Sequence, residues 1–272
     1  MNPWTETLAV TALAVFGALL GWGCSRLRAP WWGLGYLVPM SVVLVRVVVA
    51  RRPEWALHPL IAWQWTGRWA FAGAAAAVAM LFATLVPKLP VKRDRWALGG
   101  LVIVLVSYLG IWPTVSAAWS RDRLMSLVTS IPPDGVCRQS TDYTCGPAAA
   151  VTVLRRLGVS AEEGALALAA GTSPAVGTPP EALVRAIKEQ FGSQGVRAEL
   201  HGFRSVDDLS SHLPALVVVR FGLLLDHWLC VIENHGEWLT VADPLSGPVK
   251  MSRSELESRW RHEAVTLRRE SR

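Results

Sequence analysis

A cysteine that could act as a nucleophile, Cys145, follows a glutamine that could stabilise an oxyanion, Gln139, by six positions in the segment Gln-Ser-Thr-Asp-Tyr-Thr-Cys-Gly-Pro. A strongly helix-forming run, Ala148 to Leu157, follows the cysteine and stops at Gly158. Proline is tolerated in the first turn of a helix, as at Pro147, and glycine is favoured just after the last turn. The pattern therefore predicts a helix with Cys145 at its N-terminus.

A cysteine at the start of a helix is placed to act as a nucleophile. The helix macrodipole favours negative charge at this end, which stabilises a thiolate. A thiolate that attacks a carbonyl also needs a base and donors for the oxyanion that forms. The side-chain amide of Gln139 and the backbone N–H of Cys145 are the donors that this spacing predicts.

A base and a residue to orient it follow later in the chain. His227 comes after the apolar run Val217–Leu225, and Asp243 closes the run Trp238–Ala242 and precedes Pro244. A carboxylate that holds a histidine in its useful tautomer is the usual third member of such a group. We therefore expect His227 to act as the base and Asp243 to orient it.

The order Gln, Cys, His, Asp, with Cys-Gly at the helix start and Asp-Pro followed by Gly, resembles the papain-like cysteine peptidases. It resembles in particular cysteine peptidase family 39, the bacteriocin-processing double-glycine leader peptidases, over about residues 134–260. The resemblance implies an α+β papain-like peptidase domain and a cysteine peptidase activity without a cofactor. The site that it implies consists of Cys145, His227, Asp243 and Gln139. Exporter-linked members usually carry Asp before the cysteine, where this chain has Thr144, so the cleavage motif stays open.

The resemblance implies a peptide or small precursor protein as substrate, with a separate exporter as an optional partner. The same four residues could instead serve an amidase or acyl-transfer enzyme. A catalytically degenerate module that binds leader peptides is a further alternative, and it predicts that one member of the group is missing. No metal is expected, because no Cys/His pair has the spacing of zinc ligands.

The expected elements around the site are helices followed by strands. A Ser160-x-x-Glu163 capping box predicts a helix that ends at Gly171, and Thr178-Pro-Pro-Glu begins another that runs to Phe191. Short helices are expected at Ser205–His212 and Ser252–Arg261. The alternation of apolar and polar residues predicts strands at 196–201, 215–221, 226–233, 238–243 and 248–251.

The composition of the first part of the chain indicates a membrane protein. Of the 272 residues 51% are hydrophobic, and the mean hydropathy is +0.31. Residues 1–120 carry ten Lys/Arg, three Asp/Glu and eleven of the 14 Trp, so the net charge of +6 belongs to this part. Because the bases and tryptophans flank apolar runs, membrane lipid is the expected partner and nucleic acid is not.

We expect an integral membrane protein, in a bacterial plasma membrane, with about four transmembrane helices within residues 1–120. The spans are expected at about 7–24, 31–50, 69–87 and 96–119, since roughly 20 residues cross a bilayer. Residues 53–67 are too short and polar to span, and are expected along the interface. A linker, 121–136, then leads to the peptidase domain, 137–272.

The membrane side of the peptidase domain stays undecided. The first and third loops carry six basic residues and the opposite side carries five, which gives no clear orientation by the positive-inside rule. The short basic loop Lys88–Arg95 favours placing this loop inside, and with four spans the peptidase domain would then face outward. Exporter-fused relatives, which keep this domain in the cytosol, indicate the reverse.

Overall fold

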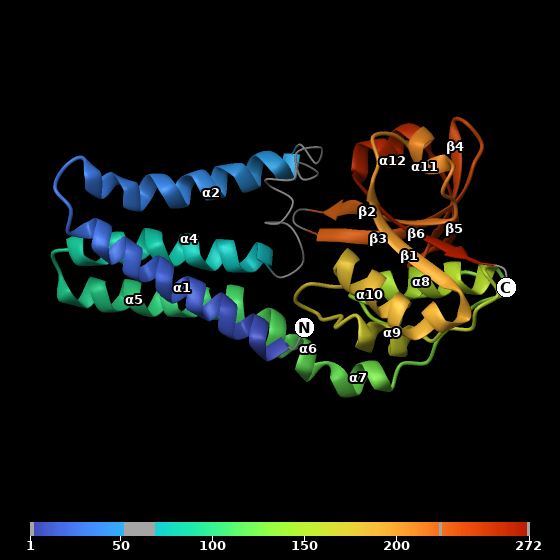
Figure 1. Ribbon diagram of the computed structural model, residues 1–272, viewed down its shortest axis with the longest axis horizontal. Coiled ribbons are helices and arrows are strands. Elements are labelled where there is room, and N and C mark those ends of the chain that lie inside the picture. Colours follow the sequence, from blue (N-terminus) through green and yellow to red (C-terminus); the bar gives the residue numbers. More distant parts are fainter. Residues whose placement is uncertain (1–2, 52–68, 223–224, 271–272) are drawn as a thin grey trace. The chain divides into compact units, whose positions relative to one another are not determined.

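The computed structural model describes residues 3–51, 69–222 and 225–270. The chain forms two compact units, Met1–Ser116 and Ala117–Arg272, which are considered separately (Figure 1). The segment 53–67, expected along a membrane interface, lies outside the described residues.

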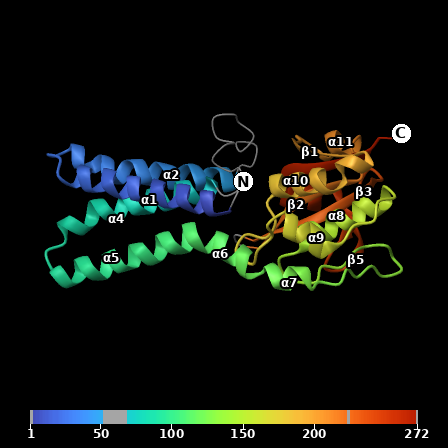
Figure 2. The same cartoon turned by 60° about the horizontal axis from the view of Figure 1, so that its bottom comes forward.

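The described part of the first unit is helical. Its helices are α1 (Pro3–Ser25), α2 (Leu34–Arg51), α4 (Trp69–Leu85) and α5 (Lys92–Val106), and a π-helical segment η4 (Ser107–Ile111) joins α5 to α6 (Trp112–Trp119). Helix α4 packs against α1, α2 and α5, and Figure 2 shows these helices running alongside one another. The four apolar segments expected from the sequence therefore fall on helices.

Small residues bring α1 and α4 close together. A Cβ at Gly17 or Gly21 would collide with the backbone of α4 at Ala76 or Met80. The fully buried Thr84 donates a hydrogen bond to the carbonyl of Met80 at 2.8 Å, and its hydroxyl lies 3.1 Å from the carbonyl oxygen of Gly21. Small side chains permit this close approach of helix backbones, as in many membrane helix pairs.

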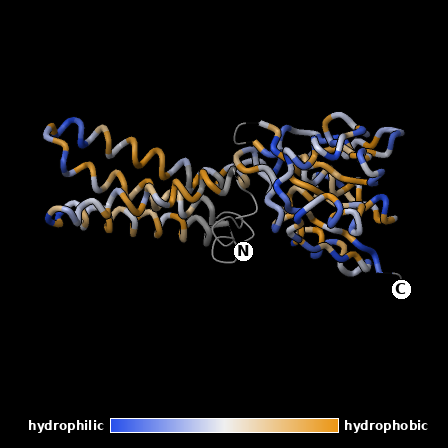
Figure 3. The backbone as a smooth tube through the Cα atoms, turned by 90° about the horizontal axis from the view of Figure 1, so that it is seen from above, coloured by the Kyte–Doolittle hydropathy of each residue, from blue (hydrophilic) through white to orange (hydrophobic). Residues whose placement is uncertain are grey.

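One described helix is long and apolar enough to cross a membrane, Leu8–Ser25. The apolar helices Trp31–Val45 and Ala72–Lys88 are shorter. Hydrophobic residues predominate along the helices of this unit (Figure 3), and many are exposed, such as Leu37 (67%) and Ile103 (69%). By length and composition the structure supports one span, and the four-span region stays a prediction.

The second unit combines a six-stranded antiparallel sheet with helices, which is an α+β fold. The strands are β1 (Val196–Gly202), β2 (Ala215–Gly222), β3 (Leu225–Asn234), β4 (Trp238–Asp243), β5 (Gly247–Ser252) and β6 (Trp260–Arg269), in the order β1-β6-β2-β3-β4-β5. The helices are α7 (Arg121–Met125), α8 (Cys145–Arg156), α9 (Glu163–Ala169), α10 (Pro180–Phe191), α11 (Val206–Ser210) and α12 (Arg253–Arg259).

Each face of the sheet buries its own core. On one face α8, α9 and α10 pack, and on the other lie α11 and α12 (Figure 1). Alternation along β3 divides its residues between them, since Trp228 and Cys230 belong to the first core and Leu229 and Val231 to the second. The residues expected as a linker, 121–136, contain α7, whose Leu124 is buried beside α9.

Most expected elements of this unit are confirmed. The five strands and the helix at Cys145 occur within one or two residues of their expected ends. The capping-box prediction is wrong, because α9 begins at Glu163 and the side chain of Glu163 bonds Ser140 instead. The helix expected to run to Arg261 ends at Arg259, and β6 begins directly at Trp260.

Candidate active site

Cys145 is the first residue of α8 and is 6% exposed. The first N–H groups of a helix have no acceptor within the helix, so the N–H of Cys145 is available to a ligand. At the other end Gly158 has a φ of +72°, and the N–H of Val159 donates to the carbonyl of Leu154 at 2.9 Å. This glycine-based C-cap ends the helix that Cys145 begins.

Gly146 allows the start of α8 to pack tightly. A Cβ on Gly146 would lie 3.0 Å from the Cβ of Thr178 and 3.1 Å from the indole of Trp228. Trp228 is buried, and its indole N–H donates to the carbonyl of Thr178 at 3.0 Å. The tryptophan next to His227 therefore packs under the N-terminus of α8.

Antiparallel strand pairing brings His227 of β3 to Asp243 at the end of β4. The ring Nε2 of His227 lies 2.8 Å from Asp243 Oδ1. Because a carboxylate accepts, Nε2 carries the hydrogen and Nδ1 is the nitrogen left for another partner. The carboxylate is itself held, since the N–H of Leu245 donates to Oδ1 at 2.8 Å and the Ser246 hydroxyl donates to Oδ2 at 2.9 Å.

Cys145 lies close enough to His227 to affect its protonation, so one ring interacts with both the nucleophile candidate and the carboxylate. Burial lowers the pKa of His227, but the hydrogen bonds and negative charges of Asp243 and Cys145 outweigh it and raise the pKa to about 9. Burial raises the pKa of Asp243, yet the hydrogen bonds from His227, Leu245 and Ser246 leave it lowered. Both shifts favour an imidazolium beside a carboxylate at neutral pH.

The backbone of Gln139 is tied to the strand end that carries Asp243. Its N–H donates to the carbonyl of Pro244 at 3.0 Å. Its side-chain Nε2 donates to the carbonyl of Thr141 at 2.8 Å, which leaves one amide hydrogen for a ligand. The Oε1 atom is buried and has no hydrogen-bond partner within the described chain.

A threonine pair shapes the turn between Gln139 and Cys145. The fully buried Thr144 accepts hydrogen bonds at Oγ1 from the N–H and the hydroxyl of Thr141, both at 3.1 Å. Its own hydroxyl lies 3.2 Å from the Thr141 carbonyl, the same oxygen that receives Gln139 Nε2. Thr144 thus supports the turn that leads from Gln139 to Cys145.

The other cysteines of the second unit have a different environment. Cys137 and Cys230 are free and fully buried in the core beside α8. Burial raises the pKa of each thiol to about 12, and for Cys137 the negative charges of Glu163 and Glu162 act in the same direction. Both thiols therefore stay protonated at neutral pH.

Several residues that hold the site were missed in the sequence. Thr141, Ser246 and Glu163 contact the four candidates or their neighbours through hydrogen bonds. Ser246 had a signal, because Asp followed three residues later by Ser is typical of a turn closed by a carboxylate. Glu163 had none, because the pairing of α9 with the segment before α8 is a tertiary contact.

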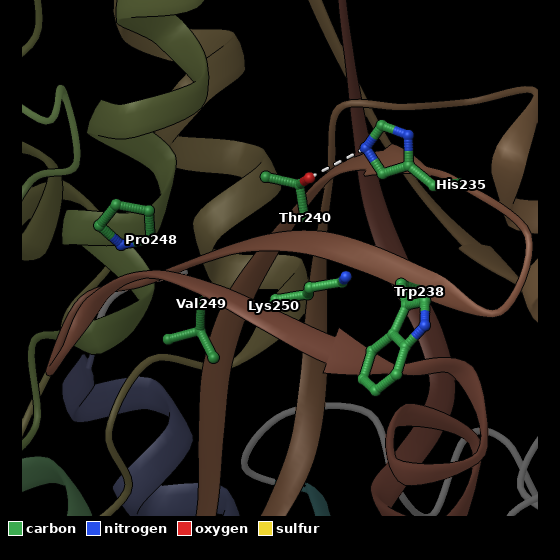
Figure 4. Close-up of a pocket in the computed structure, with 6 residues that line it drawn as sticks. All are labelled: His235, Trp238, Thr240, Pro248, Val249 and Lys250. Atoms are coloured by element: carbon green, nitrogen blue, oxygen red, sulfur yellow. Dashed lines mark hydrogen bonds between the residues drawn. The ribbon is translucent and has the colours of Figure 1, made fainter.

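The pocket in Figure 4 lies along β4 and β5, and none of the four candidate residues lines it. It measures about 420 Å³ and is lined by His235, Trp238, Thr240, Pro248, Val249 and Lys250. Across residues 3–51, 69–222 and 225–270, no three His, Cys, Asp or Glu side chains are grouped so as to hold a metal ion.

Known proteins resemble part of this chain. An uncharacterised protein of Methanothermobacter marburgensis is 35% identical over 118 residues, which cover 43% of this chain and 77% of that protein. One of Methanothermobacter thermautotrophicus is 34% identical over 125 residues, which cover 46% and 82%.

Among solved structures, the peptidase domain of Streptococcus ComA, a bifunctional ABC transporter, has 23% identity and a TM-score of 0.44, over 49% of this chain and 96% of that chain. A double-glycine-motif protease from an AMS/PCAT transporter, in complex with a leader peptide, has 17% identity and a TM-score of 0.43, over 52% and 94%.

The sequence model of the Peptidase C39 family matches residues 135–272, about half of the chain. The matched segment contains all four candidate residues. The chain therefore belongs to the Peptidase C39 family.

Proposed function

We propose that the chain is a membrane-anchored cysteine peptidase that cleaves a peptide or a leader-bearing precursor. The observation that supports this best is the place of His227, whose ring lies 2.8 Å from the Asp243 carboxylate and whose pKa is raised by both Asp243 and Cys145. A nucleophile, a base and an orienting group within hydrogen-bond reach are what covalent catalysis by cysteine requires.

Proton transfer from Cys145 to His227 gives a thiolate–imidazolium pair. The raised pKa of His227, about 9, keeps the imidazolium charged at neutral pH, and the N-terminus of α8 stabilises the thiolate. The thiolate attacks the carbonyl carbon of the scissile bond. The Gln139 amide and the backbone N–H of Cys145 donate to the oxyanion that results.

His227 then returns the proton to the leaving amine. The acyl group stays on Cys145 as a thioester, and the neutral ring next removes a proton from water for deacylation. Asp243 keeps Nε2–H directed towards itself, so that Nδ1 is the nitrogen that exchanges protons with Cys145 and with water.

We propose that about four helices of residues 1–120 hold the protein in a membrane. Support comes from Leu8–Ser25, which is long and apolar enough to span, and from the exposed apolar side chains on the neighbouring helices. The substrate would then be a peptide or small precursor delivered at the membrane, with or without a separate exporter. Family members fused to exporters usually carry Asp at the position of Thr144. The proposal therefore does not include cleavage after a double glycine, and the test below uses several residues at the cleaved bond.

The test uses the full chain in detergent micelles and quenched fluorescent peptides with Gly-Gly, Gly-Ala or bulkier residues at the central bond. Cys145→Ala and His227→Ala should abolish cleavage or nearly so. Gln139→Ala should lower the rate by about 10²–10³, as expected for one of two oxyanion donors. Wild-type-level cleavage by Cys145→Ala would refute the proposal.

Two other outcomes would identify the alternatives. Release of ammonia from glutamine or amide substrates, with no cleavage of peptides, would indicate an amidase or acyl-transfer enzyme on the same residues. Peptide binding without turnover, equal in the wild type and in Cys145→Ala, would indicate a binding module.

A further inference from the structure

Glu163 is a fully buried carboxylate that the proposed mechanism does not use. Both of its oxygens accept hydrogen bonds from one residue, Ser140: Oε1 from the backbone N–H at 2.8 Å and Oε2 from the hydroxyl at 2.6 Å. Burying a carboxylate is costly unless it is well hydrogen-bonded. A two-point contact with a single loop residue indicates that the position of this loop matters.

Ser140 directly follows Gln139, the proposed oxyanion donor. The N–H of Gln139 is fixed by the Pro244 carbonyl at 3.0 Å, and the next N–H along the chain is fixed by Glu163. The peptide that carries the Gln139 side chain is thus held from both sides, by the β4–β5 turn and by the first residue of α9.

The side chain of Gln139 itself makes few hydrogen bonds. Within the described parts of the chain, its Nε2 makes one hydrogen bond, to the Thr141 carbonyl, and its buried Oε1 has no partner. The direction of the free amide hydrogen therefore depends on the backbone at Gln139 and Ser140. An oxyanion donor must lie within about 2.7–3.1 Å of the developing charge, so a small loop displacement would remove its effect.

We propose that Glu163 is a positioning residue that fixes the Gln139 amide for transition-state stabilisation. The inference rests on the proposed function, in which Gln139 donates to an oxyanion. Glu163 touches neither substrate nor thiol; it acts through Ser140. Its effect is confined to steps in which a carbonyl oxygen becomes negative, and attack of the thiolate on an alkyl halide does not depend on it.

The experiment measures kcat and KM of the full chain in micelles on a quenched peptide that the wild type cleaves. Glu163→Ala should lower kcat, with little change in KM, by no more than Gln139→Ala does, which is about 10²–10³. The double variant should be no slower than Gln139→Ala alone, because residues that act as a unit are not additive. Alkylation of Cys145 by iodoacetamide should keep its wild-type rate in all of these variants.

Three variants guard against misfolding as an explanation. Glu163→Gln should retain most of kcat, since its amide oxygen can accept from the Ser140 N–H while its amide nitrogen donates to the hydroxyl. Ser140→Ala removes the 2.6 Å bond to Glu163, together with a longer 3.4 Å contact with the Val128 carbonyl, but keeps the bond from the backbone N–H. It should lose part of kcat, with no loss in the Gln139→Ala background. The matched control is Glu162→Ala, because Glu162 is exposed, bonds Thr129 and should leave kcat unchanged.

Wild-type kcat in Glu163→Ala and Ser140→Ala would overturn the inference while leaving the peptidase proposal standing. So would a double variant whose losses multiply, or an alkylation rate that falls together with kcat, since each would indicate a general structural role. A wild type that cleaves no peptide, or that cleaves no faster than Cys145→Ala, would instead refute the proposed function on which the inference rests.

Discussion

Replacing Asp243 by Asn separates the charge of the carboxylate from its geometry. Oδ1 accepts from both His227 Nε2 and the Leu245 N–H, whereas Oδ2 meets a hydroxyl, Ser246, that can also accept. The amide oxygen of Asn should therefore take the place of Oδ1, and its NH₂ group should face Ser246. The ring keeps its hydrogen bond and its tautomer, and only the negative charge is lost.

The expected effect is on the protonation of His227. In the wild type its pKa is raised from 6.5 to about 9, which at about 1.36 kcal/mol per pH unit corresponds to roughly 3 kcal/mol in favour of the imidazolium. Without the carboxylate charge the pKa should fall back towards 6.5, because burial, the opposing effect, remains. Peptide cleavage should fall by well under the roughly 10⁴-fold seen when a serine-type triad is left with the wrong tautomer.

The assay is carboxymethylation of Cys145 by iodoacetate between pH 5 and pH 10, followed by mass spectrometry of the full chain. Iodoacetate is an anion, so its reaction depends on the imidazolium beside the thiolate and declines as His227 loses its proton. The decline should fall near pH 9 in the wild type and at clearly lower pH in Asp243→Asn. A decline that stays near pH 9 in the variant would refute the reasoning, as would a loss of cleavage equal to that of His227→Ala.

The same proton couples to folding. A histidine whose pKa is higher in the folded chain than the unfolded value of 6.5 contributes stability that is complete below about pH 6.5 and is lost as pH rises through about 9. Melting temperatures of wild type and Asp243→Asn should therefore converge between these pH values. Equal differences at pH 6 and pH 10 would contradict a raised pKa.

Two further predictions concern packing and topology. Gly146→Ala should destabilise the chain by about 1–3 kcal/mol and lower cleavage, because the new Cβ would lie 3.0 Å from Thr178 and 3.1 Å from buried Trp228; denaturant unfolding that shows a gain in stability with full activity would contradict this. Reporter fusions after Arg123 should show an outward location and fusions at Asp94 an inward one, if four spans insert as proposed; the reverse pattern would invert the orientation and leave the peptidase proposal intact.

Local signals predicted much of the second unit. Pro147 and Gly158 marked the ends of α8, and alternation marked the first five strands, because both depend on neighbours in the sequence. Strand β6 was missed because it begins at Trp260, directly after α12 ends at Arg259. No turn residue such as glycine, proline or asparagine marks the boundary between them. Its buried residues Val265 and Leu267 stand in a short run with charged residues at both ends. Its place between β1 and β2 is set by pairing over long sequence distances.

The four candidate residues could be chosen from the sequence because their types and order are unusual together. The bonds that hold them could not. The sequence predicts that Glu163 belongs to a capping box, because Ser160 stands three residues before it. In the structure its carboxylate instead accepts hydrogen bonds from Ser140, which is a tertiary contact. The support that Thr144 gives to Thr141 is local, but a threonine in a turn carries no signal for the geometry of its hydroxyl.

The strand order has a consequence for when this protein can fold. Strand β1 pairs with β6 along its length, and β2 lies between β6 and β3, so the sheet cannot close until the residues up to Arg269 have been synthesised. Synthesis proceeds at about 5–20 residues per second, so α8, β3 and β4 exist for several seconds before the last strand reaches its place. During that interval β1 and β2 expose unpaired edges, and the nascent chain is open to misassembly or to chaperones. The helix α8 that begins at Cys145 is thus made early, whereas the sheet against which it packs is completed late.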